Sequence, residues 1–190
     1  MNLKGSKTEK NLLTAFAGES QARNRYGFFA SVAKKEGYEA ICGVFTDSAD
    51  NEREHAKREF KFLEGGSVEI TAAYPAGKIG TTAENLKAAA AGEHYEWTEM
   101  YPGFGKVARE EGFADIAAAF EHIARAEKGH EARFLKWLSA LESGNVFKSA
   151  QPVKWRCRNC GYIHEGTEPP TVCPACTHPR GYFEVTTENW

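Results

Sequence analysis

The chain has 190 residues, of which 42% are hydrophobic and 26% are charged, a composition typical of one large or two modest globular domains. Its formal net charge of −2 gives no electrostatic reason to expect nucleic acid or a membrane surface as a partner. The opening residues lack an apolar signal core, and no stretch approaches the roughly 18 apolar residues of a membrane helix, so we expect a cytoplasmic protein.

Apolar residues recur at helical intervals through most of the chain, which predicts a four-helix bundle. The predicted helices span residues 6–37, 38–63, 81–112 and 113–142. Thr81 and Glu84 have the spacing of a capping box at the start of the third helix. Tight breaks at Gly37 and Gly112 favour two antiparallel hairpins, and the intervening residues 65–80 are long enough for a crossover along the bundle.

An internal repeat supports this division, because a shift of 75 residues aligns the segment beginning at Val32 with the segment beginning at Val107. The same shift relates three pairs of polar residues: Glu52 with Glu127, His55 with His130, and Tyr26 with Tyr101. One hairpin therefore appears twice in the sequence. Glu19, however, falls on His94, with Glu93 one position short of register, so the first and third helices have diverged or slipped there.

The second and fourth helices each carry the motif Glu-x-x-His, which places a carboxylate and an imidazole on the same helix face. The third helix adds a Glu-x-x-Glu motif, and the first adds one more glutamate. The candidate ligands are Glu19, Glu52, His55, Glu93, Glu96, Glu127 and His130. Acidic and histidine side chains from four helices form the ligand set of di-iron carboxylate bundles, so we expect two metal ions among them.

The charge of these ligands supports the same interpretation. If ionised, the five glutamates carry a charge of about −5, which a bundle interior tolerates only when cations lie among them. A single glutamate in such helices is more often a surface residue, so the inference depends on the paired motifs and not on any one member. The glutamates that we expect at the surface are Glu54, Glu59, Glu84, Glu99, Glu110 and Glu121.

After Asn145 the helical periodicity ends, and prolines and glycines alternate with β-favouring aromatic residues. We predict a bundle domain at residues 1–146 and a second domain at residues 153–190, which is too short to rely on an apolar core alone. Its two Cys-x-x-Cys pairs predict a tetrahedral four-thiolate metal site for iron or zinc. The four cysteines are Cys157, Cys160, Cys173 and Cys176. Cys42 stands apart and is expected to be a small buried residue.

Taken together, the acidic residue of the first helix, the two Glu-x-x-His motifs, the extra Glu93-x-x-Glu96 and the C-terminal cysteines resemble the rubrerythrin family over essentially the full length. The resemblance implies a mainly α fold, with a ferritin-like four-helix bundle and a small, β-rich rubredoxin-like domain. It implies two iron ions in the bundle and favours iron over zinc in the four-cysteine site.

The resemblance also implies individual roles for the site residues. Bridging of the two irons is implied for Glu52 and Glu127, and terminal ligation for Glu19 on one iron and for Glu93 with His130 on the other. Glu96 and His55 would exchange as ligands when the site is reduced. Tyr26 and Tyr101 resemble tyrosines that lie just outside the ligands in the family, although ordinary core packing explains them equally well.

The activity implied by the resemblance is reduction of hydrogen peroxide to water, with electrons passing through the iron of the cysteine site. The external donor would be a rubredoxin or an NAD(P)H-dependent reductase, and a homodimer would bring one subunit's ribbon beside the partner's di-iron site. Two alternatives stay open: a ferroxidase or iron-handling bundle, and a non-enzymatic metal-binding protein with zinc in the ribbon.

Overall fold

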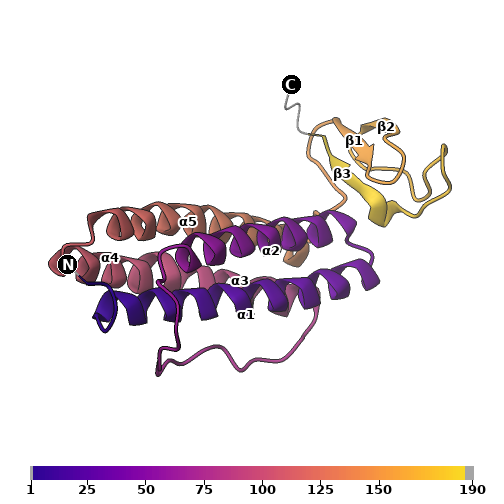
Figure 1. Ribbon diagram of the computed structural model, residues 1–190. Coiled ribbons are helices and arrows are strands. Elements are labelled where there is room, and N and C mark those ends of the chain that lie inside the picture. Colours follow the sequence, from indigo (N-terminus) through magenta and orange to yellow (C-terminus); the bar gives the residue numbers. More distant parts are fainter. Residues whose placement is uncertain (1, 187–190) are drawn as a thin grey trace.

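The computed structural model describes residues 2–186, so the last four residues of the predicted second domain lie outside the described part. Long helices lie side by side in a bundle, and a small ribbon of strands stands at one end (Figure 1). The bundle helices are α1 (Lys7–Lys35), α2 (Glu39–Phe60), α3 (Thr82–Tyr95), α4 (Tyr101–Glu110) and α5 (Ala114–Glu142). The mainly helical fold class is confirmed. Within the described residues, no helix combines the length and the hydrophobicity that crossing a bilayer requires.

The tight breaks between paired helices have the same geometry in both halves of the chain. Gly37 and Gly112 have φ values of +83° and +84°, a left-handed conformation that glycine adopts without a steric penalty. The amide that follows each glycine donates a 2.8 Å hydrogen bond back into the preceding helix, from Tyr38 to the Ala33 carbonyl and from Phe113 to the Ala108 carbonyl. The predicted hairpin duplication therefore extends to the backbone of the turns.

The helix predicted for residues 81–112 begins as expected but is not continuous. Thr81 and Glu84 form the predicted capping box, so the start of α3 is confirmed. A π-helical segment, η1 (Glu96–Met100), then joins α3 to α4. A π turn closes hydrogen bonds between residues i and i+5, so it holds more residues than an α turn, and no residue type in this stretch signals it.

The π-helical segment explains why the repeat loses register on the third helix. Glu19 and Tyr26 are seven residues apart, whereas Glu93 and Tyr101 are eight apart. The wider turn of η1 lies between Glu93 and Tyr101 and absorbs the additional residue. Glu93, and not His94, is therefore the structural counterpart of Glu19.

Residues 61–81 connect α2 to α3 without regular structure and run along the outside of the bundle, as expected for a crossover (Figure 1). The hydroxyl of Tyr74 donates a 2.8 Å hydrogen bond to the backbone carbonyl of Thr14. This bond fastens the middle of the crossover to α1.

Two apolar clusters fill the bundle. One cluster contains Tyr26, Phe29, Phe45 and Phe134, and the other contains Leu12, Tyr101 and Phe120. Phe45 and Phe120 are repeat mates, so each hairpin contributes its equivalent aromatic ring to a different cluster. Cys42, expected to be buried, is instead half-buried and packs at the edge of the first cluster.

The C-terminal ribbon is an antiparallel sheet with the strand order β2-β1-β3. Its strands are β1 (Val153–Cys157), β2 (Ile163–Gly166) and β3 (Phe183–Val185). Trp155 lies at the centre of a very small core, and its Nε1 donates a 2.9 Å hydrogen bond to the Gly166 carbonyl. Cys157, Cys173 and Phe183 complete the buried part of this core.

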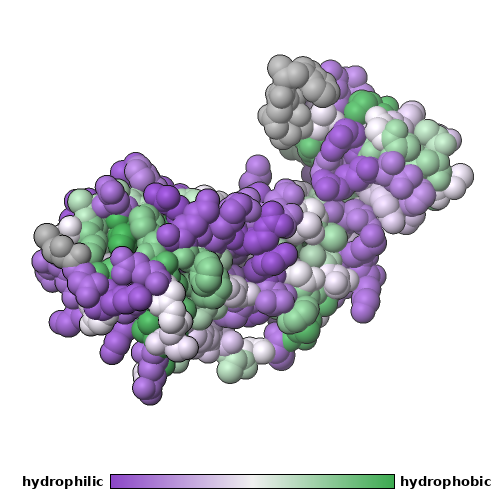
Figure 2. All heavy atoms as spheres, in the orientation of Figure 1, coloured by the Kyte–Doolittle hydropathy of each residue, from purple (hydrophilic) through white to green (hydrophobic). Residues whose placement is uncertain are grey.

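The ribbon packs against the end of the bundle where α1 turns into α2. Figure 2 shows it as a separate lobe, while hydrophilic residues cover much of the bundle on the same face. A Cβ atom added to Gly181 would lie 2.3 Å from the Gly37 carbonyl oxygen, so the two backbones meet where no side chain fits. The Arg158 side chain occupies the space beside Gly43 of α2 in the same way.

Candidate metal centres

Inside the bundle, the predicted ligands gather into two adjoining groups. One contains Glu19, Glu52, His55 and Glu127, and the other contains Glu52, Glu93, Glu127 and His130. In each group one ligand atom from every residue lies within 4.8 Å of the others. Glu52 and Glu127 belong to both groups, as two carboxylates that bridge a pair of metal ions must.

The two shared carboxylates each offer one oxygen to each histidine. For Glu127, Oε1 lies 2.8 Å from Nδ1 of His55 and Oε2 lies 2.7 Å from Nδ1 of His130. For Glu52, Oε2 lies 3.0 Å from Nδ1 of His55 and Oε1 lies 3.2 Å from Nδ1 of His130. The Glu-x-x-His spacing on α2 and α5 produces this arrangement, because it places each histidine on the same helix face as its own glutamate.

The donor atoms fit metal ions better than they fit one another. Both carboxylate oxygens of Glu52 and of Glu127 are buried and make no hydrogen bond, although the histidine nitrogens approach them. The same is true of Nδ1 in His55 and in His130, and of one oxygen in each of Glu19 and Glu93. Buried polar atoms are almost always paired, so this convergence of unpaired oxygen and nitrogen atoms suits two bound cations.

The pKa values show how the residues share charge when no metal is bound. Burial alone would raise the pKa of Glu127, but the close approach of His130 and His55 to its two oxygens holds it at about 2. Burial would lower the pKa of His130, but Glu127 and Glu52 raise it to about 12, and they raise the pKa of His55 to about 10. Without metal ions, protons on the two histidines supply the positive charge beside these carboxylates. Metal binding must displace those protons.

Two buried tyrosines cross between the repeats to reach the ligands. The Tyr26 hydroxyl donates a hydrogen bond to Glu93, and the Tyr101 hydroxyl donates one to Glu19. Burial raises the pKa of both tyrosines well above its ordinary value, and the adjacent glutamate adds to the effect, so both hydroxyls keep their protons. Hydrogen bonds of this kind fix the orientation of ligand carboxylates. The tyrosines therefore pack in the core and contact the ligands at once.

Glu96 is placed apart from the other candidate ligands. It lies at the start of η1, is buried, and belongs to neither ligand group of the described residues, whereas His55 belongs to one. Burial, followed by the charge of Glu93, raises the pKa of Glu96 well above its ordinary value. Glu96 lines a cavity of about 280 Å³ between α1, η1 and the crossover, together with Arg25 and Tyr74. Among the candidate ligands, Glu96 is the one that lines this cavity in the part of the chain that the structure describes.

One expectation about the surface glutamates is wrong. Glu59 is only 1% exposed, because it lies seven residues after Glu52 on the same face of α2 and turns into the bundle. Its Oε1 lies 2.9 Å from the Tyr101 hydroxyl, so Tyr101 contacts Glu59 as well as Glu19. The two-turn spacing from Glu52 is a signal that sequence analysis could have used.

A second residue escaped sequence analysis because nothing in its sequence context marks it. The amide oxygen of Asn51 lies 3.1 Å from Nε2 of His130. An amide oxygen only accepts hydrogen bonds, so Nε2 carries a hydrogen, and Nδ1 is the nitrogen that faces Glu52 and Glu127. This contact fixes the ring in the orientation that metal binding through Nδ1 requires.

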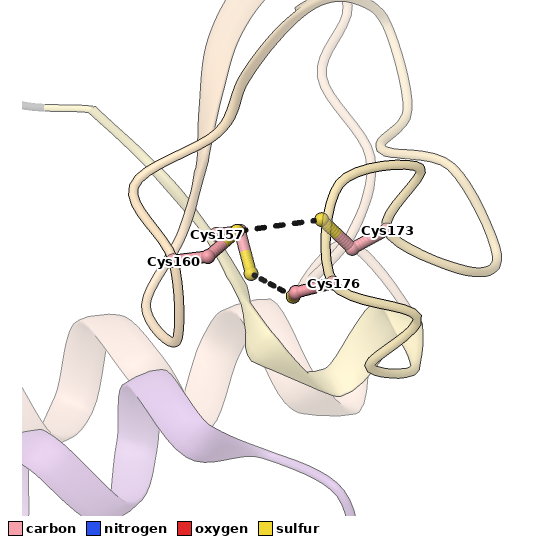
Figure 3. Close-up of side chains that lie close together, drawn as sticks. All are labelled: Cys157, Cys160, Cys173 and Cys176. Carbon is pink, nitrogen blue, oxygen red and sulfur yellow. Dashed lines mark hydrogen bonds between the residues drawn. The ribbon is translucent and has the colours of Figure 1, made fainter.

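In the ribbon, two loops bring the four cysteines together (Figure 3). The sulfur atoms of Cys157 and Cys176 are 3.8 Å apart, and those of Cys160 and Cys173 are 3.7 Å apart. These separations are much longer than the roughly 2.05 Å of a disulfide bond. They match the edge of about 3.8 Å in a tetrahedron whose metal–sulfur bonds are about 2.3 Å long. The geometry fits iron and zinc equally well.

The two cysteine loops have related backbones. Gly161 and Thr177, each the residue after the second cysteine of a pair, have φ values of +79° and +61°. Their amides donate hydrogen bonds of 2.8 and 2.9 Å to the carbonyls of Cys157 and Cys173. Each loop therefore turns back on itself and points both of its sulfur atoms to one side.

Comparisons with known proteins agree with both centres. The family model described as Rubrerythrin matches residues 10–138, and the model described as Rubrerythrin, rubredoxin-like domain, matches residues 155–184. A rubrerythrin of Porphyromonas gingivalis is 60% identical over 189 residues, which cover 100% of this chain and 94% of that protein.

Solved structures show the same architecture. Nigerythrin in its fully reduced, all-ferrous state matches with a TM-score of 0.64 and 32% identity, over 96% of this chain and 91% of that one. A bacterioferritin of Desulfovibrio desulfuricans matches the fold with a TM-score of 0.63 and 23% identity, over 73% of this chain and 82% of that one. The bundle is thus ferritin-like, and the ribbon is an addition to it.

Proposed function

The chain belongs to the rubrerythrin family, with a ferritin-like di-iron bundle and a rubredoxin-like domain, and on that premise we propose that it is a peroxidase that reduces hydrogen peroxide to water. The reaction consumes two electrons and two protons for each peroxide molecule and yields two water molecules. The observation that carries the proposal is the pair of ligand groups that share Glu52 and Glu127, which fits two metal ions side by side.

Two iron ions held by these residues would supply both electrons and, as Lewis acids, would lower the free-energy cost of charge building on the peroxide oxygens. The protein holds the ligand side chains in fixed positions and keeps them buried away from water. Glu52 and Glu127 are buried and lie between the two groups, so they set the separation of the bound pair. Tyr26 and Tyr101 keep Glu93 and Glu19 in position through their hydrogen bonds.

We assign Glu96 and His55 to the exchangeable positions of the site. In support, His55 stands among the ligands of one group while Glu96 stands outside both, in the cavity beneath the crossover. We propose this cavity as the entry route for hydrogen peroxide, because Glu96 lines it. This assignment predicts that Glu96→Ala slows turnover while the shared carboxylates still bind metal.

We further propose that electrons arrive one at a time through iron in the four-cysteine site, from a rubredoxin or an NAD(P)H-dependent reductase. Within one chain the path is long. The ribbon meets α2 at Gly43, and the nine residues from there to Glu52 span roughly 14 Å along the helix at about 1.5 Å per residue. A homodimer in which the partner subunit's ribbon lies beside the bundle would shorten the path.

The test is to reduce the iron-reconstituted protein without air, count its metals, and follow the visible absorption after adding either peroxide or dioxygen. Oxidation that is much faster with peroxide than with dioxygen supports the peroxidase. Equal or faster oxidation by dioxygen would instead identify a ferroxidase, and zinc in the ribbon with no redox response would identify a metal-binding protein without enzymatic activity.

A further inference from the structure

Glu59 is a buried carboxyl group that the proposed reaction does not use. It lies near the end of α2 and belongs to neither ligand group. Its Oε1 has one partner, the Tyr101 hydroxyl at 2.9 Å, and its Oε2 is buried without a partner. An ionised carboxylate with an unpaired oxygen is costly at such a position, so its presence calls for a specific role.

The hydrogen bonds around Tyr101 determine the protonation state of Glu59. The Tyr101 hydroxyl has one hydrogen, yet it lies within hydrogen-bond distance of carboxyl oxygens of both Glu19 and Glu59. An ionised carboxylate only accepts hydrogen bonds, so two ionised partners would leave one contact without a hydrogen. Every contact is satisfied if one of the two carboxyl groups is a neutral acid that donates to the Tyr101 oxygen. A metal ligand must be ionised, so with metal bound Glu19 accepts from Tyr101 and Glu59 is the neutral acid.

We propose that Glu59 is a positioning residue of the di-iron site, a neutral carboxylic acid whose hydrogen bond holds Tyr101 so that the tyrosine hydrogen points at Glu19. This role rests on the proposed peroxidase function only for its effect on turnover. The hydrogen-bond assignment itself stands on the two Tyr101 contacts and on the place of Glu19, but not Glu59, in a ligand group.

The repeat shows that this arrangement is confined to one half of the site. The shift of 75 residues carries Glu59 onto Phe134, whose ring meets Tyr26 edge-on at 5.3 Å. Tyr26 therefore contacts a single carboxylate, that of Glu93, and an aromatic ring occupies the place of the second acid. On the Glu19 side, hydrogen bonds therefore link three residues in a row, Glu59, Tyr101 and Glu19. On the Glu93 side they link two, Tyr26 and Glu93.

Every element packed around Glu59 contributes to its charge environment. The titratable groups that face it are Glu19, Glu52, His55, Tyr74, Tyr101 and Glu127. Burial raises the pKa of Glu59 to about 8; the Tyr101 hydrogen bond and the charge of His55 act in the opposite direction, and Glu127 and Glu52 add to the rise. Burial also raises the pKa of Glu19, so it is metal ligation that makes Glu19 the ionised partner and leaves Glu59 as the neutral acid.

The first test is infrared spectroscopy of the full chain loaded with zinc, which keeps the ligands deprotonated without redox chemistry. The wild-type protein is expected to show the carbonyl band of a protonated carboxylic acid, and Glu59→Gln is expected to lose it. Glu54→Gln is the matched control, because Glu54 lies on the exposed face of the same helix and pairs with Lys57. Glu96 is also buried and outside both ligand groups, so the test is the difference spectrum between each variant and the wild type. A Glu59→Gln difference spectrum that lacks a lost carbonyl band, as expected for Glu54→Gln, overturns the proposal.

The second test is turnover of the iron-loaded protein. Glu59→Leu removes the donor and is expected to lower kcat about tenfold, less than the 100-fold or greater loss typical of a direct proton donor. Glu59→Gln can still donate to Tyr101 through its amide, so it should retain most activity. It should also lose the fall in activity that we expect of the wild type above about pH 8. Wild-type turnover and an unchanged pH profile in both variants would overturn the role. An inactive wild type would overturn only the peroxidase function, since the infrared band is measured without turnover.

Discussion

The two metal centres of this chain hold their ligands in place in different ways. The bundle centre collects ligands from positions as far apart as Glu19 and His130, and apolar clusters on either side hold them in place. The ribbon centre collects four cysteines from two adjacent loops around a core of very few residues. The bundle thus organises its metal site through the fold, whereas the metal must help to organise the ribbon.

The largest expected effect is a difference between the two domains in their response to metal removal. A chelator that strips both is expected to unfold the ribbon and leave the bundle helices in place, because a structural thiolate site contributes about 10 to 16 kcal/mol to a small domain. Protease cleavage near residue 150 and the near-ultraviolet circular dichroism of Trp155 report on the ribbon, and far-ultraviolet circular dichroism reports on the helices. Cys157→Ser should act like the chelator, and Cys42→Ser should have no effect. A ribbon that stays protected after complete chelation would contradict the comparison.

The next largest effect is expected at the bundle centre alone. Glu127→Ala removes a carboxylate shared by both ligand groups, so we expect loss of at least one bundle metal and a fall in peroxide turnover of about 100-fold or more. The visible spectrum of the iron-loaded ribbon should not change. Glu110→Ala, an exposed glutamate of α4, is the control. Normal metal content in the Glu127 variant would show that the shared carboxylates have been misidentified.

Raising the pH should destabilise the bundle only when its metals are absent. Burial raises the pKa of Glu93 to about 8 from 4.5, although the nearby His130 opposes the shift. Glu127 and Glu52 raise the pKa of His55 to about 10 from 6.5 against the effect of burial. A raised folded-state pKa stabilises the fold at pH values below the unfolded pKa, and this stabilisation is lost as the pH rises through the folded pKa. Glu127, whose pKa is lowered to about 2, acts oppositely, and its contribution is lost only in strong acid.

The free energy of unfolding of metal-free protein is therefore expected to fall between about pH 5 and pH 9, at about 1.4 kcal/mol for each pKa unit that a group is shifted. Thermal unfolding with and without bound metal measures the effect. A midpoint that rises with pH in the metal-free protein would mean that the ligands carry their charges differently from the description above.

The smallest expected effect is that of removing the Tyr26 hydroxyl group. Tyr26→Phe leaves the ring in the aromatic cluster but removes the hydrogen bond to Glu93, so metal affinity of the bundle should fall about tenfold. Tyr38→Phe, whose ring stacks on Phe147 away from both metal centres, is the control. Metal titration of the apo protein followed by competition with a chelator gives the affinities.

Both centres were predictable from sequence to the extent that their ligands follow local spacing. The Glu-x-x-His pairs and the Cys-x-x-Cys pairs each place two donors on one helix face or one loop, and the repeat relates the two halves. The placement of Glu96 outside the ligand groups, the burial of Glu59 and the contact from Asn51 depend on how α2, η1 and α5 pack against one another. The interruption at η1 depends on a single additional residue that has no characteristic composition.

The π-helical turn at η1 also marks where the two halves of the repeat differ in length by one residue. A residue gained between Glu93 and Tyr101 would have rotated everything after it by about 100°, unless the helix widened locally to absorb it. Removing one residue from this stretch, for example Thr98, should restore a continuous α-helix and the seven-residue spacing that separates Glu19 from Tyr26.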